Sequence, residues 1–205
     1  GVNPIACALL PTPREVGADV AVGDGQPLGL DTAFGGPYLG FMATTSAMTR
    51  KLPGRIVGET KDVDGKTGYV LTLSAREQHI RREKASSNIC SNEALCAMTA
   101  SVYLAANGPQ GLARVAENCA AHAHYLAAEL AKIPGFALRH QGREFFHEFL
   151  TDCPVDPDML CARLAEKGIL GGLPVDGGML WCCTELCLRN DMDELITAIR
   201  EVCAQ

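Results

Sequence analysis

A long helical stretch that is interrupted near its middle divides the sequence. Its first part is Ala-rich and apolar, and its second part is amphipathic as far as Ile133. Gly108 and Pro109 stand between the two parts. Because proline is favoured in the first turn of a helix and disrupts a helix interior, this pattern predicts two helices joined at a break. We therefore expect two domains that meet in this stretch, residues 1–110 and residues 111–205.

The part of the chain ahead of the break predicts strands separated by glycine-rich turns. The expected elements are a strand at 18–23, a Gly-rich loop, a strand at 39–43, a short helix at 45–52, a hairpin turning at 64–65 and a charged helix at 76–84. The first strand is apolar on successive residues, a pattern typical of a strand buried on both faces. Such a strand would belong to a larger sheet.

The part after the break predicts a small α+β unit. The expected elements are strands near 137–140 and 145–151, a helix near 156–167, a strand near 179–183 and a final helix from Asp191. This β-β-α-β-α order is typical of helices that pack on one face of a sheet.

Charge and hydropathy exclude some kinds of partner. The formal net charge is −6, without the basic excess that nucleic-acid binding needs. No apolar run approaches the roughly 20 residues of a membrane-spanning helix, and no export signal is visible at the N-terminus. We expect a cytoplasmic protein that binds neither nucleic acid nor membrane.

The ten cysteines fit a reduced compartment better than a disulfide framework. Several occupy apolar positions of expected helices or strands, such as Cys96 and Cys119. No C-x-x-C pair occurs, and Cys182, Cys183 and Cys187 fall in or beside an expected strand. Buried free thiols are the expected state, and no metal site is predicted.

Two common catalytic motifs are missing or incomplete. The segment from Gly23 to Gly29 is one residue too long for a dinucleotide-binding loop and has Pro27 where the helix should begin. A G-x-S-x-G nucleophile elbow does not occur. The sequence therefore favours neither a Rossmann-type dehydrogenase nor a serine hydrolase.

Two polar segments are candidates for anion binding. The charged segment 76–84 could be a solvated helix with ion pairs between residues four apart, such as Glu77 and Arg81, or its guanidinium groups could converge on a phosphate or carboxylate. The segment Ser86-Ser87-Asn88 precedes an apolar helix, where hydroxyl and amide groups cap the helix or bind a phosphate. Spacing alone leaves both alternatives open in each segment.

Four long motifs in order resemble the P-protein of the glycine cleavage system, and within that family subunit 1 of the two-subunit form. The resemblance is dense through residue 110, sparse beyond it, and covers only the second half of the family's chain. The motifs are GADVAVGDGQPLG at 17–29, AFGGPYLGF at 33–41, KLPGRIVG at 51–58 and LTLSAREQHIRREKASSNIC at 71–90. We therefore expect this chain to be a portion of a longer subunit.

The resemblance implies an α/β fold of the fold-type-I pyridoxal-phosphate kind: part of the large-domain sheet in residues 1–110, and a small α+β domain in residues 111–205. It also implies an enzyme, glycine dehydrogenase (decarboxylating), an oxidoreductase of glycine catabolism. In this family pyridoxal phosphate takes up the electrons released when glycine is decarboxylated, and the aminomethyl group passes to the lipoyl arm of the H-protein. The cofactor supplies the difficult chemistry.

Gln26 stands where the resemblance places the lysine that holds the cofactor. A glutamine amide cannot form a Schiff base, so this chain alone is expected to be inactive, with no catalytic residue of its own. The expected partner is subunit 2, which carries the lysine. Ser86, Ser87, Asn88 and Arg81 are the residues expected to reach the partner's cofactor, with Ser86 on its phosphate.

Two alternatives remain open. The chain could instead be a scaffold that stabilises the partner or docks the H-protein without contributing to catalysis, which Gln26 allows equally well. An exposed strand at 18–23 could also pair with a second copy and give a homodimer.

Overall fold

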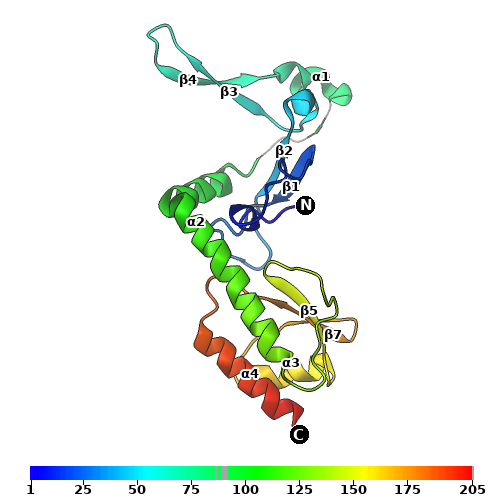
Figure 1. Cartoon of the computed structure of the whole chain (residues 1–205). Coiled ribbons are helices and arrows are strands. Elements are labelled where there is room, and N and C mark those ends of the chain that lie inside the picture. Colours follow the sequence, from blue (N-terminus) through cyan, green and yellow to red (C-terminus); the bar gives the residue numbers. More distant parts are fainter. Residues whose placement is uncertain (86, 89–91, 205) are drawn as a thin grey trace. The chain divides into compact units, whose positions relative to one another are not determined.

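The computed structural model describes residues 1–85, 87–88 and 92–204, which form two compact units, Gly1–Asn107 and Gly108–Gln205 (Figure 1). Helix α2, Ala94–Leu130, runs through the division and is interrupted at Gly108, where φ is 63° and ψ is −179°. This conformation is open almost only to glycine, and Pro109 starts the next helical segment. The predicted break is confirmed. No described helix is long and apolar enough to cross a membrane.

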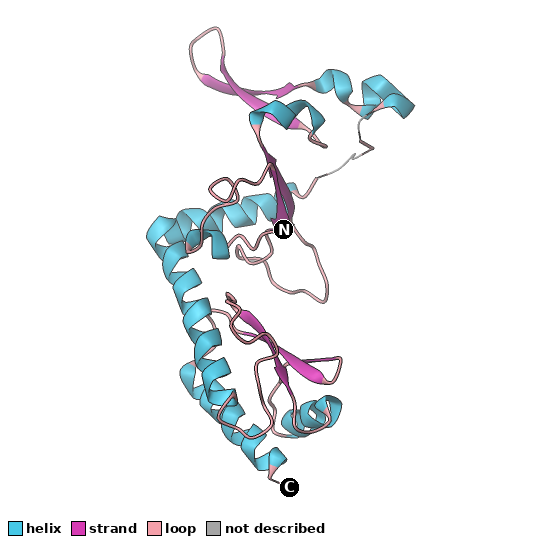
Figure 2. Cartoon of the chain, turned by 45° about the vertical axis from the view of Figure 1, so that its right-hand side comes forward, coloured by secondary structure: helices cyan, strands magenta, loops and turns pink. Residues whose placement is uncertain are grey.

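Unit 1 contains two separate antiparallel strand pairs and several short helical turns (Figure 2). Its elements ahead of α2 are η1 (Ala6–Ala8), β1 (Val20–Asp24), β2 (Gly40–Thr44), η2 (Ser46–Lys51), β3 (Ile56–Lys61), β4 (Thr67–Thr72), η3 (Ser74–Arg76), α1 (Gln78–Arg81) and η4 (Arg82–Lys84). In the β3–β4 turn, Asp62 Oδ1 accepts hydrogen bonds from the N–H groups of Asp64 and Lys66, both at 2.9 Å. The predicted hairpin is confirmed.

Two expectations for unit 1 are wrong. No residue of β1 is buried, because β1 pairs with β2 in a two-stranded sheet, and Val20 and Val22 are about 40% exposed. The charged segment does not form one helix from 76 to 84 either. The α-helix ends at Arg81, because Arg82 takes a positive φ of 53°, which an α-helix does not accommodate.

Unit 2 is a three-stranded antiparallel sheet with helices against it. Its elements after α2 are β5 (Glu148–Asp152), α3 (Pro157–Glu166), β6 (Leu173–Val175), β7 (Gly178–Cys182) and α4 (Arg189–Cys203). The strand order is β5-β7-β6, and Leu150 lies opposite Leu180. Strand β6 was not predicted. The strand expected at 137–140 is replaced by a single bridge from Leu138 to Thr151.

One face of this sheet holds the hydrophobic core. In β5 and β7 the buried residues alternate with more exposed ones, so each strand turns one face inward. The core joins β5 and β7 to the second part of α2, α3 and α4, and its largest members include Leu126, Leu130, Phe149, Leu160, Leu164, Met179, Trp181, Ile196 and Ile199. The expected packing of helices on one face of the sheet is confirmed.

Both outer edges of the sheet are protected. The segment 137–139 runs beside β5, where Arg139 N–H donates to the Leu150 carbonyl at 3.0 Å and Asp152 N–H donates to the Ala137 carbonyl at 2.8 Å. The other edge strand, β6, has only three residues, with Pro174 at its centre. Short edge strands and proline are common devices against pairing with another chain.

Candidate functional site

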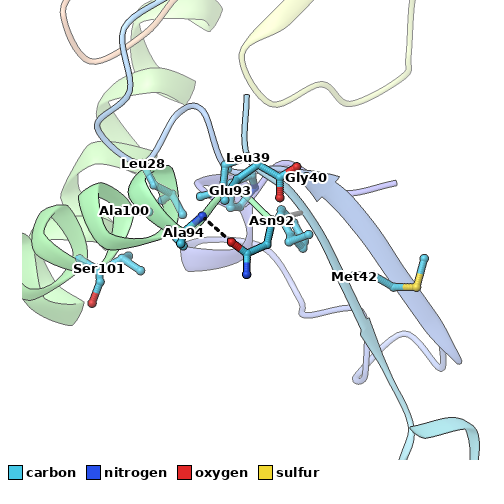
Figure 3. A pocket seen from close by; sticks show the side chains of 14 residues that line it. Leu28, Leu39, Gly40, Met42, Asn92, Glu93, Ala94, Ala100 and Ser101 are labelled. Atoms are coloured by element: carbon cyan, nitrogen blue, oxygen red, sulfur yellow. Dashed lines mark hydrogen bonds between the residues drawn. The ribbon is translucent and has the colours of Figure 1, made fainter. Parts of the chain in front are cut away.

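A cavity of about 710 Å³ lies in unit 1 between the start of α2, β2 and the loop that precedes β2 (Figure 3). The residues that line it are Pro4, Gly25, Leu28, Leu39, Gly40, Phe41, Met42, Asn92, Glu93, Ala94, Ala97, Ala100, Ser101 and Leu104. Most of these side chains are apolar. The cavity lies between the predicted Gly-rich loop and the start of α2.

The loop between β1 and β2 is held in place by one carboxylate. Asp24 Oδ1 accepts hydrogen bonds from the N–H groups of Gln26, at 2.8 Å, and Leu39, at 3.2 Å. Gly25 N–H donates to the Leu39 carbonyl at 2.7 Å. A Cβ on Gly25 would lie 2.9 Å from Leu39 Cδ2, so a larger residue would require the Leu39 side chain to shift. The loop is therefore folded tightly against the start of β2.

Gln26 lies at the head of this loop but does not line the cavity. Its side-chain amide turns back on the loop, where Nε2 donates to the Asp31 carbonyl at 3.2 Å. Its neighbours Gly25 and Leu28 do line the cavity. The structure thus places the predicted Schiff-base position beside the cavity, with a side chain that stabilises the loop.

The start of α2 carries a negative charge at the cavity. Asn92 Oδ1 accepts a hydrogen bond from Ala94 N–H at 3.2 Å, and the Glu93 carbonyl accepts from Ala97 N–H at 2.8 Å. Glu93 is the only charged side chain among the described residues that line the cavity, and none of them is basic. A carboxylate is stabilised at the positive end of a helix, so Glu93 occupies the position that an anion would otherwise favour.

The other predicted site residues do not line this cavity. Ser86 lies outside the described residues. Ser87 is partly buried and Asn88 is exposed. Arg81 is exposed, and its Nε donates to the Ala75 carbonyl at 3.1 Å. The described part of the chain therefore does not gather Arg81, Ser87 and Asn88 into one site with the cavity.

Arg76 has a structural role that the sequence analysis missed. Its guanidinium donates to the carbonyls of Leu52 and Gly54, the latter at 2.8 Å, and so connects the segment after η2 to η3. The carboxylate of Glu77 lies 3.9 Å from the Arg76 guanidinium. Glu77 thus forms an ion pair with Arg76, whereas the helical spacing favours a pair with Arg81.

All six lysines of the chain lie within the described residues, and none lines the cavity. Two of them form ion pairs in unit 2, Lys132 with Glu129 and Lys167 with Glu201. The others lie at the ends of short elements or in the β3–β4 turn; they are Lys51, Lys61, Lys66 and Lys84. No lysine amine is therefore placed to react with a carbonyl compound bound in this cavity.

Comparison with known proteins identifies the family. Residues 1–199 match the family described as Glycine cleavage system P-protein. The chain belongs to this family. Similar P-proteins include the probable glycine dehydrogenase (decarboxylating) subunit 1 of Moorella thermoacetica, 51% identical over 99% of this chain and 47% of the relative. The corresponding protein of Desulfitobacterium hafniense is 49% identical over 98% of this chain and 46% of the relative. The chain spans about half the length of these relatives.

Solved structures confirm the fold. A crystal structure of glycine decarboxylase (P-protein) in inhibitor-bound form matches with a TM-score of 0.92 at 46% identity, over 98% of this chain and 47% of that one. Glutamate decarboxylase from Lactobacillus brevis matches with a TM-score of 0.57 at 18% identity, over 92% of this chain and 38% of that one. This P-protein chain thus has the fold-type-I fold of pyridoxal-phosphate enzymes.

The cavity residues of this P-protein chain do not fit covalent attachment of pyridoxal phosphate. The cofactor aldehyde is held by a lysine amine, and the described lining offers no lysine and no basic group for the phosphate. We therefore assign no chemical step on this chain to the cofactor.

The cysteine thiols are a second group of ionisable side chains, most of them in unit 2. The nine cysteines that the structure describes are all free thiols. Burial raises the pKa of Cys119 to about 11 with a further contribution from Glu185. Cys182 is exposed as a residue, but partial desolvation of its thiol, together with Glu148, raises its pKa to about 11. Burial, with Cys187 next in importance, raises the pKa of Cys183 to about 12. These thiols are protonated at neutral pH.

Proposed function

We propose that this chain is part of subunit 1 of a cytoplasmic glycine dehydrogenase (decarboxylating). In this role it completes a site in which subunit 2 holds pyridoxal phosphate, glycine loses its carboxyl group and the aminomethyl group passes to the lipoyl arm of the H-protein. The chain alone is inactive. Its contribution is to position groups and exclude water at the interface, because it supplies no amine for the cofactor.

The main support for the proposal is that the β1–β2 loop has a glutamine at the position where the family resemblance expects the cofactor lysine. Family membership and identity near 50% to proteins named subunit 1 support the functional class. Gln26 occupies the loop position where the family resemblance expects the cofactor lysine, and its amide is bonded to the Asp31 carbonyl. The absence of lysine from the described cavity lining supports a cofactor held by another chain.

The two units have different parts in this proposal. Unit 1 is assigned to the C-terminal part of the large domain and unit 2 to the small α+β domain, with the boundary at or near the break in α2. The exposed valines of β1 support the assignment of unit 1, because helices cover the faces of the sheet in a doubly covered α/β domain. Pairing of the same strand with a second copy remains a proposal for the isolated chain.

A labelling experiment tests where the cofactor is attached. The chain, with and without subunit 2, is incubated with pyridoxal phosphate, reduced with borohydride and mapped by peptide mass spectrometry. We expect no stoichiometric pyridoxyl-lysine on this chain and one on subunit 2. A stoichiometric adduct on one of the six lysines of this chain would overturn the proposal. Q26K serves as a positional probe, because it places an amine in the β1–β2 loop.

A second experiment separates the half-site from a scaffold. In the complex with subunit 2, Ser86→Ala should weaken cofactor binding by roughly tenfold or more, since a hydrogen bond to a charged acceptor is worth about 1.5–3 kcal/mol. Ser46→Ala, at the exposed start of η2, is the matched control. Arg81→Ala and Asn88→Ala extend the test. Normal cofactor affinity and glycine turnover in all three site variants would favour the scaffold.

A further inference from the structure

One corner of the unit 2 sheet brings together three different metal-binding side chains. Strands β5 and β7 are neighbours in this sheet (Figure 1). Glu148 begins β5 and Cys182 ends β7, and the antiparallel register places these two residues opposite each other. His147 comes directly before β5. A ring nitrogen of His147, a carboxylate oxygen of Glu148 and the Sγ of Cys182 all lie within 4.8 Å of one another. Glu148 and Cys182 are exposed, so an ion in solution has access to them.

Two of these atoms already have the spacing of ligands that share one ion. Cys182 Sγ lies 3.5 Å from His147 Nδ1. With zinc–sulfur bonds of about 2.3 Å, zinc–nitrogen bonds of about 2.0–2.1 Å and tetrahedral angles, the two ligand atoms are about 3.6 Å apart. The thiol and the imidazole therefore need almost no rearrangement. The Glu148 carboxylate oxygen lies within 4.8 Å of both atoms, so it needs to approach by at most about 1 Å. Rotation of this exposed side chain provides such a movement.

The backbone around the cluster is fixed by the sheet. Cys183 N–H donates to the His147 carbonyl at 3.0 Å, which continues the pairing of β5 with β7 beyond Glu148 and Cys182. His147 Nδ1 also lies 3.2 Å from the Cys183 carbonyl, and this contact holds the ring at the sheet corner. Binding of an ion to Nδ1 would replace this contact with the Cys183 carbonyl. Ligands carried by strands are held more precisely than ligands on loops.

We infer that His147, Glu148 and Cys182 form a binding site for a divalent transition-metal ion of the zinc type. A thiolate is a soft ligand that Mg²⁺ and Ca²⁺ do not favour, whereas zinc accepts nitrogen, oxygen and sulfur together. Three protein ligands leave a fourth tetrahedral position for water or for a donor from another molecule. The site lies in unit 2 and does not depend on the proposed function of the cavity in unit 1.

Cobalt(II) is the probe that tests this site, because its absorption spectrum reports the ligands of a zinc-type ion. The reduced full chain is titrated with Co²⁺ under anaerobic conditions. We expect a thiolate-to-cobalt charge-transfer band and tetrahedral ligand-field bands that saturate at one equivalent. Added Zn²⁺ should abolish both sets of bands. A wild-type chain that shows neither set of bands would overturn the inference.

Substitutions then assign the ligands. Cys182→Ser should remove the charge-transfer band, and Glu148→Gln and His147→Ala should each weaken Co²⁺ binding at least about tenfold, since even the loss of a group that orients a ligand costs about 10–100-fold. Cys7→Ser, in η1 of unit 1, removes a thiol remote from the cluster in sequence and unit, and should leave the titration unchanged. A charge-transfer band of wild-type strength in Cys182→Ser would refute the site, because the ion would then be bound by other thiols. Circular dichroism verifies that each variant is folded.

Discussion

At the scale of single residues, the buried pair of Trp181 and Thr151 makes the sharpest stability prediction. Trp181 Nε1 donates to Thr151 Oγ1 at 2.9 Å, and both residues are 2% exposed. Thr151→Val keeps the shape but leaves the indole N–H without this acceptor, so the free energy of unfolding should fall by about 1–3 kcal/mol. Urea unfolding followed by tryptophan fluorescence measures the change, since Trp181 is the only tryptophan.

The control for this substitution is Thr197→Val. Thr197 is exposed, and its hydroxyl donates to the Asp193 carbonyl of the same helix at 2.8 Å. Loss of this exposed hydrogen bond should change the free energy of unfolding by no more than about 0.5 kcal/mol. Equal effects of the two substitutions would mean that the buried hydrogen bond does not matter to stability.

The sequence predicted what single residues can do chemically better than it predicted which residues meet in the fold. The sequence showed that Gln26 could not hold a cofactor aldehyde, because the chemistry of an amide does not depend on the fold. It did not show that His147 meets Cys182, since the two residues are 35 apart and only the register of β5 and β7 brings them together. Ser86 remains a prediction, outside the described residues.

At the scale of secondary-structure elements, the β5–β7 pairing depends on Gly178. A Cβ at this position would lie 2.4 Å from the Thr151 carbonyl oxygen, a backbone atom that cannot move without disturbing the sheet. Gly178→Ala should therefore lower the free energy of unfolding by about 1–3 kcal/mol. Chemical denaturation of the full chain, monitored by far-ultraviolet circular dichroism and tryptophan fluorescence, tests this.

Gly68→Ala in β4 is the matched control, because an added Cβ meets no atom within 4 Å. This substitution should leave stability unchanged or raise it slightly, since glycine weakens a strand. A loss as large as that of Gly178→Ala would show that the clash with the Thr151 carbonyl is not the cause.

The first turn of α3 gives a second prediction at this scale. Asp156 is the N-cap, and its Oδ1 accepts a hydrogen bond from Met159 N–H at 2.8 Å. Asp156→Ala should cost about 1 kcal/mol of stability, while Asp156→Asn, which retains the acceptor, should cost much less. Thermal unfolding of the two variants compares them; similar losses would remove the cap as the explanation.

Elements with strong local signals were predicted, and those that depend on distant residues were not. Turn residues revealed the β3–β4 hairpin and the break at Gly108. Strand β6 was missed because Pro174 lies within its three residues, where proline normally argues against a strand. The helix expected at 76–84 was too long, because the charge pattern does not predict the positive φ of Arg82 that ends the helix.

At the scale of the whole molecule, the buried thiols predict sensitivity to alkaline pH. The pKa values of the buried Cys119 and Cys183 are raised to about 11 and 12, mainly by burial. An unfolded thiol ionises near pH 8.5, so the unfolded chain loses protons first as the pH rises. This contribution to stability is fully present below about pH 8.5 and is lost progressively towards pH 11–12.

Urea unfolding midpoints at a series of pH values between about 8 and 10.5 measure this loss, with unfolded thiols titrating near pH 8.5. The midpoint should fall with rising pH, and less steeply in Cys183→Ala, which removes one of the titrating groups. Cys7→Ser is the control, because Cys7 belongs to unit 1 and the titrating thiols belong to unit 2. Identical slopes in wild type and Cys183→Ala would contradict the role of the Cys183 thiol.

The break in α2 was predictable from local chemistry, but the exposure of unit 1 was not. The Gly108–Pro109 pair marks the break whatever surrounds it. The run of apolar residues in β1 predicts burial on both faces, whereas β1 has one neighbouring strand and no buried residue. Burial depends on what packs against a strand, and sequence pattern alone does not report that.

The protected edges of the unit 2 sheet limit the ways in which this unit can bind other proteins. The segment 137–139 lies along β5, and the opposite edge is the short, proline-containing β6. Incoming strands therefore find no extended ladder of free backbone groups, and templated fibre growth from this sheet is disfavoured. Unit 2 must therefore bind other proteins through its side chains rather than through backbone pairing. Single substitutions can then change which partner it binds while its backbone stays unchanged.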